Sequence, residues 1–567
     1  MIAEELVEAV ELVDSPLIIN KKKINNETYS FEILGKKNNW NIELLFPESF
    51  PYRLPIAKLL DKKYIGIVPH VNQCGTICIE ESDSVLLDYE RPSDIISTYL
   101  QDAITLLERV KLKIYQDELF DEYEGYFDLT KKVNSFYFAE DKLEHVSLKL
   151  LYKENNRQQK HAVPTLLYDK NHPLPAKFSN LDKTTDLQIV NIIHLPLNNP
   201  MLPPSKGSDI TPEYIDSIRG HITKNNDKKL KKLLKKEKNK NQFFILLSLP
   251  RTSTERSQLL LHYTSNQSLP HPLLYLSAEW KITSYLIKRH NKEYLLERGG
   301  ADESLIDKKV TIIGCGSVGS EIAFTLAKAG VGELTLIDKD GLDADNIYRH
   351  NLGGYYLNFF PDSKTGIVKG NYKVNAITSK LRGELPFIKL NPKTVNFLEI
   401  NTDKDLLKSD VLIVAVGSPT VSLLINRKLK ELGLNKVIFC WNEAASYGGH
   451  SLSLDLDSSC LECIYTSNSG FTMESPISLL KLGQNISSNL TGCAGVFTPF
   501  SYLDSSQTAA LATKQCIDIL MHNIHSKALS WKGDGNKNLD VTNRYTNMPL
   551  KEEIHLNQHL KCRICNG

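Results

Sequence analysis

A short apolar segment followed by a glycine-rich turn constrains this 567-residue chain more than any other feature. The run 308–313 leads into Gly-Cys-Gly-Ser-Val-Gly, and a helical pattern then extends to Gly330, a suitable helix-ending residue. A second apolar run, 333–337, ends at Asp338. Glycines let the backbone approach a phosphate, the helix N-terminus offers N–H groups, and the acid can hold a ribose hydroxyl. The pattern therefore predicts a nucleotide-binding βαβ unit with turn glycines Gly314, Gly316 and Gly319.

Polar residues after Asp338 narrow the chemistry of the expected nucleotide site. Asn346 and Arg349 belong to a D-x-D…N-x-x-R-x-N segment, and a G-x-x-K motif ends at Lys369. A dinucleotide-dependent oxidoreductase needs only the phosphate cradle and the ribose-binding acid. A polar clamp with two added cations suits a nucleoside triphosphate that is attacked at its α-phosphate. The segment therefore favours nucleotidyl transfer.

From about residue 290 to the C-terminus, the sequence resembles the ubiquitin-activating superfamily of ThiF/MoeB-like enzymes, which adenylate a C-terminal carboxylate. The resemblance implies a Rossmann-like domain, ATP and Mg²⁺ as cofactors, and a homodimer through this domain. It implies that Asp338 holds the ribose and that Asn346 and Arg349 contact the triphosphate. Lys369 would lie on the phosphate that gains charge in the transition state. For Arg349 and Lys369, a surface ion pair is the alternative.

One position departs from the pattern of this superfamily. Its members usually carry an acid in a D-x-x-D arrangement after the next strand, where the acid helps to hold Mg²⁺. This chain reads Val-Leu-Ile-Val-Ala-Val after Asp410, and Gly417 then occupies the position of that acid. Either another carboxylate, such as Glu443, supplies the ligand, or metal binding at this site is weak.

Two C-x-x-C pairs among the ten cysteines indicate a structural metal site. In so long a chain, such pairs suggest metal in a reducing compartment and not a disulfide scaffold. Four thiolates suit a closed tetrahedral Zn²⁺ site, which stabilises a fold and leaves no open catalytic position. Free thiols are the alternative, but MoeB-like proteins place two pairs in the same way. The four predicted ligands are Cys460, Cys463, Cys562 and Cys565.

Cys493 is the candidate nucleophile of the C-terminal half. It lies in a Gly/Pro-containing loop before a helical pattern that Asp504 or Ser505 can cap and that runs through Met521. An unperturbed thiol is about 3% thiolate at neutral pH, which costs about 2 kcal/mol. Capture of an acyl-adenylate held beside the thiol recovers more, about 7–11 kcal/mol. We therefore expect a thioester at Cys493; a small buried residue at a tight turn is the alternative.

The first 130 residues follow a different plan. Alternating apolar and polar residues at 29–34 and 40–46 predict antiparallel strands, and helical patterns occupy 3–12 and 93–110. The motifs F-P-x-x-F-P, H-x-N and G-x-I-C lie between the strands and the second helix. This order resembles the ubiquitin-conjugating fold, an α+β domain.

That second resemblance assigns two further catalytic residues. Cys78 closes the G-x-I-C motif and matches the thioester cysteine, and Asn72 matches the asparagine that stabilises charge on the attacked carbonyl. Val71 stands where the family has proline, so this loop lacks the fixed φ that proline would give it. The alternative for Cys78 is a small core residue. Cys74 has no motif support.

Residues 131–290 show no nucleotide signature. Apolar runs at 146–152, 189–197 and 243–249 can form a core, so we expect an α/β linker domain that holds the two catalytic ends apart. The lysine-rich segment 228–236 places its leucines on one helical face. That pattern favours a solvated basic helix over a nucleic-acid patch.

Composition restricts the compartment and the partners. With 68 basic and 67 acidic residues, no global field attracts the chain to nucleic acid or to a membrane. No apolar stretch is long enough to span a bilayer, and the N-terminus lacks a signal peptide. We expect a soluble cytoplasmic protein with an α/β multidomain fold. Its predicted domains are 1–130, 131–290 and 291–567.

One chain would then carry an activating and a conjugating centre. We expect a protein's flexible C-terminus to pass from an acyl-adenylate to Cys493, then to Cys78, and finally to an amine, either a lysine of an acceptor protein or a small amine. This layout resembles the bacterial fusion enzymes of CBASS antiphage operons, which implies a cGAS-like nucleotidyltransferase as donor. Three alternatives stay open: an enzyme for a bacterial ubiquitin-like modifier, a sulfur-carrier adenylyltransferase, and a non-catalytic nucleotide-binding scaffold.

Overall fold

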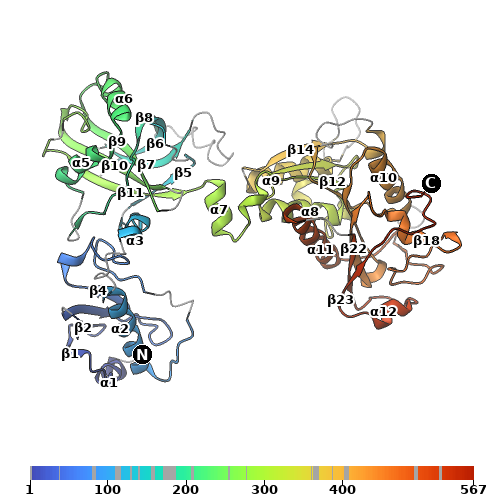
Figure 1. Cartoon of the computed structure of the whole chain (residues 1–567), viewed down its shortest axis with the longest axis horizontal. Coiled ribbons are helices and arrows are strands. Elements are labelled where there is room, and N and C mark those ends of the chain that lie inside the picture. The colour runs from blue at the N-terminus through green and yellow to red at the C-terminus, as the bar shows by residue number, and fades with distance from the viewer. Residues whose placement is uncertain are drawn as a thin grey trace. The chain divides into compact units, whose positions relative to one another are not determined.

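The chain divides into two compact units, one up to Asn291 and the other from Lys292 onward (Figure 1). The computed structural model describes residues 3–36, 39–79, 85–108, 116–127, 131–137, 141–154, 160–169, 187–205, 210–252, 256–275, 277–358, 361, 370–385, 387–400, 408–490, 496–522 and 526–566. Within these ranges, no helix is both long and apolar enough to cross a membrane.

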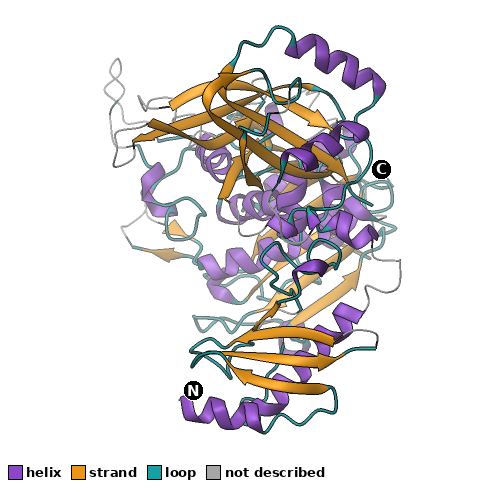
Figure 2. Ribbon diagram, turned by 90° about the vertical axis from the view of Figure 1, so that its left-hand side faces the viewer, coloured by secondary structure: helices purple, strands orange, loops and turns teal. Residues whose placement is uncertain are grey.

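The first unit begins with a four-stranded antiparallel sheet, whose strands lie in sequence order from edge to edge. The strands are β1 (Ile18–Lys23), β2 (Thr28–Leu34), β3 (Asn39–Leu45) and β4 (Ile56–Leu59). Helix α1 (Ala3–Glu11) precedes the sheet and α2 (Pro92–Glu108) follows it. Figure 2 shows the strands side by side with α1 next to them. The two predicted helices and the two predicted strands are confirmed, with small shifts at their ends.

Helix α2 joins this sheet because one of its faces is apolar. Its buried residues recur every three or four positions, which is the spacing of one helical face. They pack with the buried residues of α1 and of the sheet in a single cluster. The buried residues of α2 are Ile95, Ile96, Tyr99, Leu100, Ala103, Ile104 and Leu107.

A closed barrel of seven strands follows, in the order β10-β11-β5-β7-β6-β8-β9. Its strands are β5 (Lys131–Ser135), β6 (Glu144–Glu154), β7 (Lys160–Tyr168), β8 (Leu187–Pro196), β9 (Lys240–Pro250), β10 (Arg256–Leu269) and β11 (Lys281–Arg289). The three apolar runs of the sequence form the cores of β6, β8 and β9. The barrel was not predicted, because it closes through the pairing of β5 with β11, two strands that are distant in sequence.

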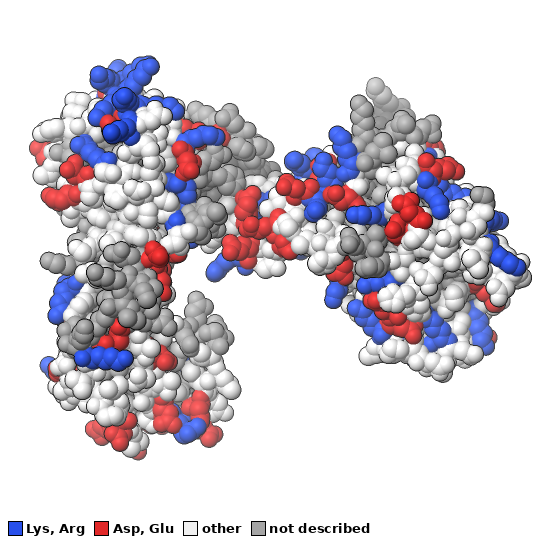
Figure 3. Space-filling view, in the orientation of Figure 1, with Lys and Arg blue, Asp and Glu red and all other residues white. Residues whose placement is uncertain are grey.

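Two helices, α5 (Pro212–Ile218) and α6 (Lys224–Leu234), lie between β8 and β9. In α6, Leu230 and Leu234 are buried. Lys and Arg side chains gather on the surface over this helix (Figure 3). The basic segment is therefore an amphipathic helix whose lysines face solvent.

The barrel and the N-terminal sheet share one core. Helix α3 (Gln116–Asp121) and the residues after it connect the two parts, and Tyr123 and Phe127 belong to the same apolar cluster as residues of the sheet and of the barrel. Glu124 forms a largely buried ion pair with Arg289 at the end of β11; Glu124 Oε2 lies 2.6 Å from Arg289 Nη1. A domain boundary at residue 130 stays a prediction, since these contacts join the segments on its two sides.

The second unit is built on an eight-stranded sheet in the order β14-β13-β12-β15-β16-β17-β22-β23. The first five strands of this order are parallel, and the last three pair antiparallel. They are β12 (Lys309–Ile313), β13 (Glu333–Ile337), β14 (Lys389–Lys393), β15 (Val411–Val414), β16 (Lys436–Asn442), β17 (Gly448–Asp455), β22 (Lys527–Lys532) and β23 (Lys551–His555).

Helices cover both faces of this sheet, as in other doubly wound folds. One core contains Val310 and Ile312 of β12 together with α8 (Ser317–Ala329), α9 (Lys373–Glu384) and α11 (Tyr502–Met521). The other core contains Ile313, helix α10 (Pro419–Glu431) and the cysteine-rich C-terminal segment. Helix α7 (Lys292–Arg298) precedes the sheet, and the short helix α12 (Asn543–Asn547) lies between β22 and β23. Strand order reverses beside β12, the point at which ligands bind in such sheets.

Candidate functional site

The turn after β12 has the close geometry that its glycines predict. Gly314 has a φ of +87°, and a Cβ there would lie 2.8 Å from the carbonyl oxygen of Ala415. A Cβ on Gly319 would lie 1.9 Å from the carbonyl oxygen of Gly314. Both positions therefore require glycine. Gly316 is the N-cap of α8, and Gly330 ends this helix in the left-handed conformation, as predicted.

Asp338 lies beyond the carboxyl end of β13 and braces the same turn. Its Oδ2 accepts a hydrogen bond from the Cys315 N–H at 2.7 Å, and its Oδ1 accepts one from the Asp340 N–H at 2.8 Å. Cys315 is buried, and burial raises the pKa of its thiol well above the ordinary value. Cys315 is therefore a core thiol.

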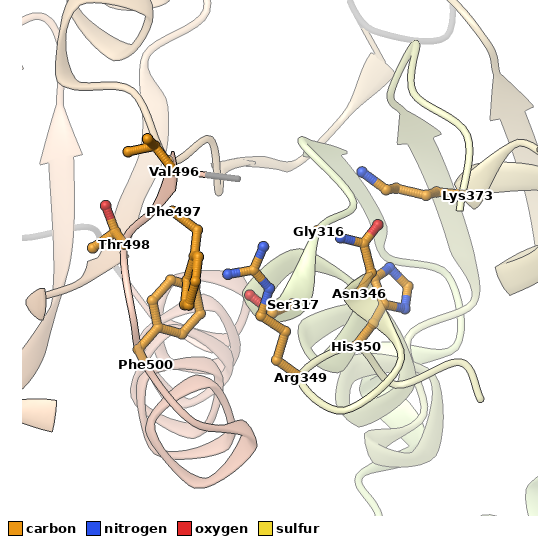
Figure 4. A pocket seen from close by; sticks show the side chains of 11 residues that line it. Gly316, Ser317, Asn346, Arg349, His350, Lys373, Val496, Phe497, Thr498 and Phe500 are labelled. Carbon is orange, nitrogen blue, oxygen red and sulfur yellow. The ribbon is translucent and has the colours of Figure 1, made fainter. Parts of the chain in front are cut away.

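A pocket of 390 Å³ opens at this end of the sheet. Figure 4 shows its two sides, with Asn346, His350 and Lys373 on one and Phe497 and Phe500 on the other. Arg349 reaches across the pocket, and its guanidinium carbon lies 5.2 Å from the centroid of the Phe500 ring. The lining residues are Gly316, Ser317, Asn346, Arg349, His350, Lys373, Gly417, Val496, Phe497, Thr498 and Phe500.

His350 holds the floor of the pocket as a neutral ring. Its Nδ1 accepts a hydrogen bond from the Leu352 N–H at 3.1 Å, so Nε2 carries the proton and donates to the Cys315 carbonyl at 2.9 Å. Burial lowers the pKa of His350 to about 4. The ring is therefore uncharged at neutral pH and connects the segment that carries Arg349 to the glycine turn.

A second, smaller cavity of 170 Å³ adjoins Cys78 in the first unit. Cys78 is exposed, and its N–H donates to the carbonyl of His70 at 2.8 Å. Asn72 is buried, and its side-chain oxygen accepts from the backbone N–H groups of Cys74 (3.0 Å) and Thr76 (2.9 Å). Asn72 therefore fixes the loop in which Cys78 lies, and both residues line the cavity.

Comparison with known proteins finds a family match for two parts of the chain. Residues 292–535 match the ThiF family, and residues 18–136 match prokaryotic E2 family B. The chain is a fusion of an E2-like domain with a ThiF-like domain. This confirms the predicted combination of the two domain types and the α/β multidomain fold, and it agrees with the resemblance to the CBASS fusion enzymes.

Individual relatives cover less of the chain. The ATP-dependent ubiquitin transferase-like protein Cap2 of Pseudomonas aeruginosa is 25% identical over 247 residues, 42% of this chain and 41% of that protein. The adenylyltransferase and sulfurtransferase UBA4 of Lodderomyces elongisporus is 25% identical over 206 residues, 35% of this chain and 42% of that protein. The chain thus spans about two fifths of the length of these curated relatives. A solved structure of Escherichia coli MccB with ATP has a TM-score of 0.31 at 19% identity, over 46% of this chain and 68% of that one.

The ThiF-like domain brings several of the predicted residues together. Gly316, Asn346 and Arg349 line its pocket. Gly314 and Gly319 shape the turn beside the pocket, and Asp338 is hydrogen-bonded to that turn. The predicted Lys369 and Cys493 lie outside the described residues. Their roles, like those of the other site residues, stay predictions.

Lys373 is a cationic pocket residue that the sequence prediction missed. It begins α9, its side chain is only 13% exposed, and its Nζ lies 3.8 Å from Asp340 Oδ2. The sequence does contain a motif for Lys373. Residues 370–373, Gly-Asn-Tyr-Lys, repeat the G-x-x-K spacing of residues 366–369 four positions later. Sequence alone offered no reason to prefer the second motif to the first.

The described pocket residues fit a triphosphate better than a directly bound Mg²⁺. Two cations and the N-terminus of α8 suit phosphate oxygens. None of the residues described as lining the pocket carries a carboxylate. Gly417, which occupies the position of the expected metal-binding acid, is one of the lining residues. Glu443, one candidate for the missing acid, accepts hydrogen bonds from His450 Nε2 at 3.0 Å and from the Leu479 N–H at 3.1 Å. Its carboxylate is already engaged in the fold.

The four cysteines of the C-x-x-C pairs converge in the ThiF-like domain, with all four sulfur atoms within 4.8 Å of one another. Three of the sulfur–sulfur distances are 3.9, 3.7 and 3.7 Å. A tetrahedron with Zn–S bonds of about 2.3 Å has edges of about 3.8 Å, so the set fits Zn²⁺. The four are Cys460, Cys463, Cys562 and Cys565.

A buried carboxylate strengthens the attachment of the C-terminus. Glu462 lies between the cysteines of the first pair and is only 1% exposed. It pairs with Arg427 of α10 at 3.1 Å and with Arg563 of the second pair. The cluster and these ion pairs together fix the C-terminal segment to residues 460–463 and, through Glu462, to α10.

Two details of the region around Cys493 are clear. Strands β20 (Ser488–Asn489) and β21 (Val496–Phe497) pair antiparallel on either side of it in sequence, and β21 lines the pocket. The following helix is capped by Ser501, and Asp504 completes the capping box from the third helical position. The prediction of Asp504 or Ser505 as the cap was therefore wrong by one turn, while the end of the helix at Met521 is confirmed.

Proposed function

We propose that this protein is an ATP-dependent ligase that activates a protein C-terminus and conjugates it to an amine. The observation that carries this proposal is the combination, in one chain, of a ThiF-like triphosphate pocket and an E2-like domain with an exposed cysteine. A ThiF-like domain alone would account for activation only. The E2-like domain supplies a second acyl carrier.

In the first step, ATP binds with its phosphates at the glycine turn, and the donor carboxylate attacks the α-phosphorus and displaces pyrophosphate. Arg349 and Lys373 stabilise the charge that develops on the phosphate oxygens, because positioned cations at developing charge make a large contribution to catalysis. Lys369 remains a candidate for the same role. Mg²⁺ would enter with the phosphates of ATP and would shield their charge.

In the second step, Cys493 attacks the acyl-adenylate, releases AMP and carries the donor as a thioester. Cys493 precedes the pocket residue Val496 by three positions in the sequence, which supports this role. Cys78 then accepts the acyl group by thioester exchange, and an amine on the acceptor, a lysine or a small amine, takes it as an amide. Asn72 would stabilise the charge on the attacked carbonyl. Covalent carriers divide one difficult acyl transfer into easier steps.

We propose a cGAS-like nucleotidyltransferase of a CBASS defence operon as the donor. The relatives named ATP-dependent ubiquitin transferase-like protein Cap2 support this assignment, since they match the chain at 24–25% identity. We further propose a homodimer through the ThiF-like domain, one Zn²⁺ on the four cysteines, and a cytoplasmic location, where thiols stay reduced. A bacterial ubiquitin-like modifier is the alternative donor.

Activation of a sulfur carrier is a second candidate function. It is favoured by the similarity to proteins named adenylyltransferase and sulfurtransferase and to a SAMP-activating enzyme. In that case the E2-like domain would bind a partner without carrying an acyl group. Replacing Cys78 with Ala would then leave thioester chemistry intact.

ATP–pyrophosphate exchange tests the first step. We expect the purified chain to incorporate labelled pyrophosphate into ATP when the C-terminal peptide of the donor nucleotidyltransferase is added. A peptide that lacks its terminal carboxylate is the control. Exchange that is absent with every candidate C-terminus would favour a nucleotide-binding scaffold instead.

A further inference from the structure

The cavity beside Cys78 has two chemically different ends, and one of its walls comes from the barrel. Its lining combines residues of the E2-like loop, of the segment around α3, and of the loop after β8. The lining residues are His70, Val71, Asn72, Cys78, Leu119, Glu122, Gly125, Tyr126 and Pro203.

The polar end is an imidazole held by carboxylates. The Glu122 carboxylate accepts the His70 backbone N–H at 2.6 Å and pairs with the ring at Nδ1. On the other side of the ring, Nε2 lies 3.7 Å from Glu118 Oε2. With Nδ1–H donated to a carboxylate, the tautomer that accepts protons at Nε2 is favoured.

His70 also has an unusual backbone. Its φ of 61° lies in the left-handed region, which is unfavourable for residues with a Cβ. Such conformations persist only where surrounding contacts impose them, and they cluster at functional sites. Here Glu122 binds both the backbone N–H and the ring, so it fixes the conformation and the direction of the imidazole together.

The apolar end is closed by the barrel. Pro203 belongs to the loop between β8 and α5, and a Cβ on Gly66 of the E2-like domain would lie 2.3 Å from the Pro204 carbonyl oxygen. Tyr214 of α5 donates to the Leu202 carbonyl at 2.7 Å and meets the Tyr123 hydroxyl at 3.0 Å. The loop is thus fixed against the E2-like domain.

We propose that this cavity binds the acceptor, a primary amine on an unbranched aliphatic stem such as a lysine side chain, and that His70 removes a proton from its ammonium group. Leu119, Tyr126 and Pro203 would contact the stem, and the carboxylates of Glu118 and Glu122 would attract the ammonium. Glu122 is a positioning residue that orients the His70 ring. The barrel thereby contributes to acceptor selection and is more than a spacer.

The proton and bond changes balance. The ammonium gives one proton to His70, and the resulting amine attacks the thioester carbonyl carbon on Cys78. The C–N bond forms, the C–S bond breaks, and the sulfur leaves as a thiolate. The nitrogen loses a second proton, which restores the Cys78 thiol, and His70 releases its own proton to water.

This inference rests on the proposed function, and the experiment separates the two. The chain is first loaded with donor and ATP, and the reductant-labile adduct on Cys78 is quantified by mass spectrometry. ATP is then removed with apyrase, and discharge is followed with free lysine and, separately, with hydroxylamine. Hydroxylamine is neutral at pH 7, so it attacks the thioester without first losing a proton.

The variants are His70→Asn, which tolerates the left-handed backbone, and Glu122→Gln, which retains an oxygen to accept the backbone N–H. We expect discharge to lysine to fall by about 100-fold in His70→Asn and by a smaller factor in Glu122→Gln, with loading and hydroxylamine discharge unchanged. The matched control is Glu27→Gln, which should behave as wild type. Glu27 lies in the turn before β2, and β3 separates that strand from β4. Pro203→Gly should lower discharge to lysine more than discharge to hydroxylamine.

Two outcomes would count against these ideas in different ways. If the wild-type chain never loads Cys78, the proposed function fails. If Cys78 loads but the His70 and Glu122 variants discharge to lysine at the wild-type rate, or lose lysine and hydroxylamine discharge equally, the proposed acceptor site is wrong.

Discussion

The two cavities of this protein differ in how many domains build them. The triphosphate pocket lies within the ThiF-like domain: the glycine turn, α8 and Asp338 follow one another within about thirty residues, and residues 496–500 close the other side. The Cys78 cavity draws on the E2-like loop, on the segment around α3, and on Pro203 of the barrel, more than a hundred residues downstream. A motif predicts the centre of each cavity, whereas the segments that complete it depend on packing between distant parts of the chain.

The largest expected effect tests the triphosphate pocket. Replacing Arg349 or Lys373 with Ala should reduce ATP–pyrophosphate exchange by about 100- to 1000-fold, since each removes a cation from the developing phosphate charge. Lys328→Ala, in the last turn of α8, is the control. Exchange that survives in Lys373→Ala but not in a Lys369 variant would return the role to the first G-x-x-K motif.

The Cys78 cavity, which the barrel completes, should be sensitive to a change that lies far from Cys78. Arg289→Met removes one barrel partner of Glu124 while Arg251 stays, and it should lower the free energy of unfolding by about 3 kcal/mol, measured by urea denaturation. Discharge of Cys78 to lysine should slow, while exchange in the ThiF-like domain should not change. Equal losses in both assays would mean that the two pockets are not independent.

Substitutions at two glycines, Gly316 and Gly319, test the described geometry of the turn after β12. Gly319→Ala should cost about 1–3 kcal/mol of stability and weaken ATP binding, because its Cβ would meet the Gly314 carbonyl. Gly316→Ala should be nearly neutral for stability, since nothing lies within 4 Å of the added Cβ. Isothermal titration with ATP and thermal unfolding distinguish them. Similar behaviour of the two variants would contradict the described turn.

The neutral His350 ring predicts a pH dependence. Burial lowers its pKa to about 4 in the folded state, below the value of about 6.5 in the unfolded chain. The unfolded state then binds more protons, so this contribution, about 3 kcal/mol, is fully present above pH 6.5 and is lost as the pH falls toward 4. His350→Gln should flatten this part of the stability profile. A profile that stays parallel to wild type between pH 7 and 4 would contradict a buried neutral His350.

The sequence predicted those parts of the molecule that depend on short-range patterns. The glycine turn of residues 314–319 and the amphipathic helix α2 are examples, and both were predicted close to their final positions. Long-range pairing was not accessible, so the closed barrel and the contribution of Pro203 to the Cys78 cavity were missed. Lys373 was missed for another reason, because two identical motifs lie four residues apart and only the fold shows that the second lines the pocket.

The most direct test of the central claim follows the acyl group through both sulfur atoms. The chain is mixed with ATP and the donor, quenched without reductant, and analysed by peptide mass spectrometry. We predict that Cys78→Ser accumulates a thioester on Cys493 and that Cys493→Ala forms none at either position. A thioester on Cys78 in the Cys493→Ala protein would contradict the relay.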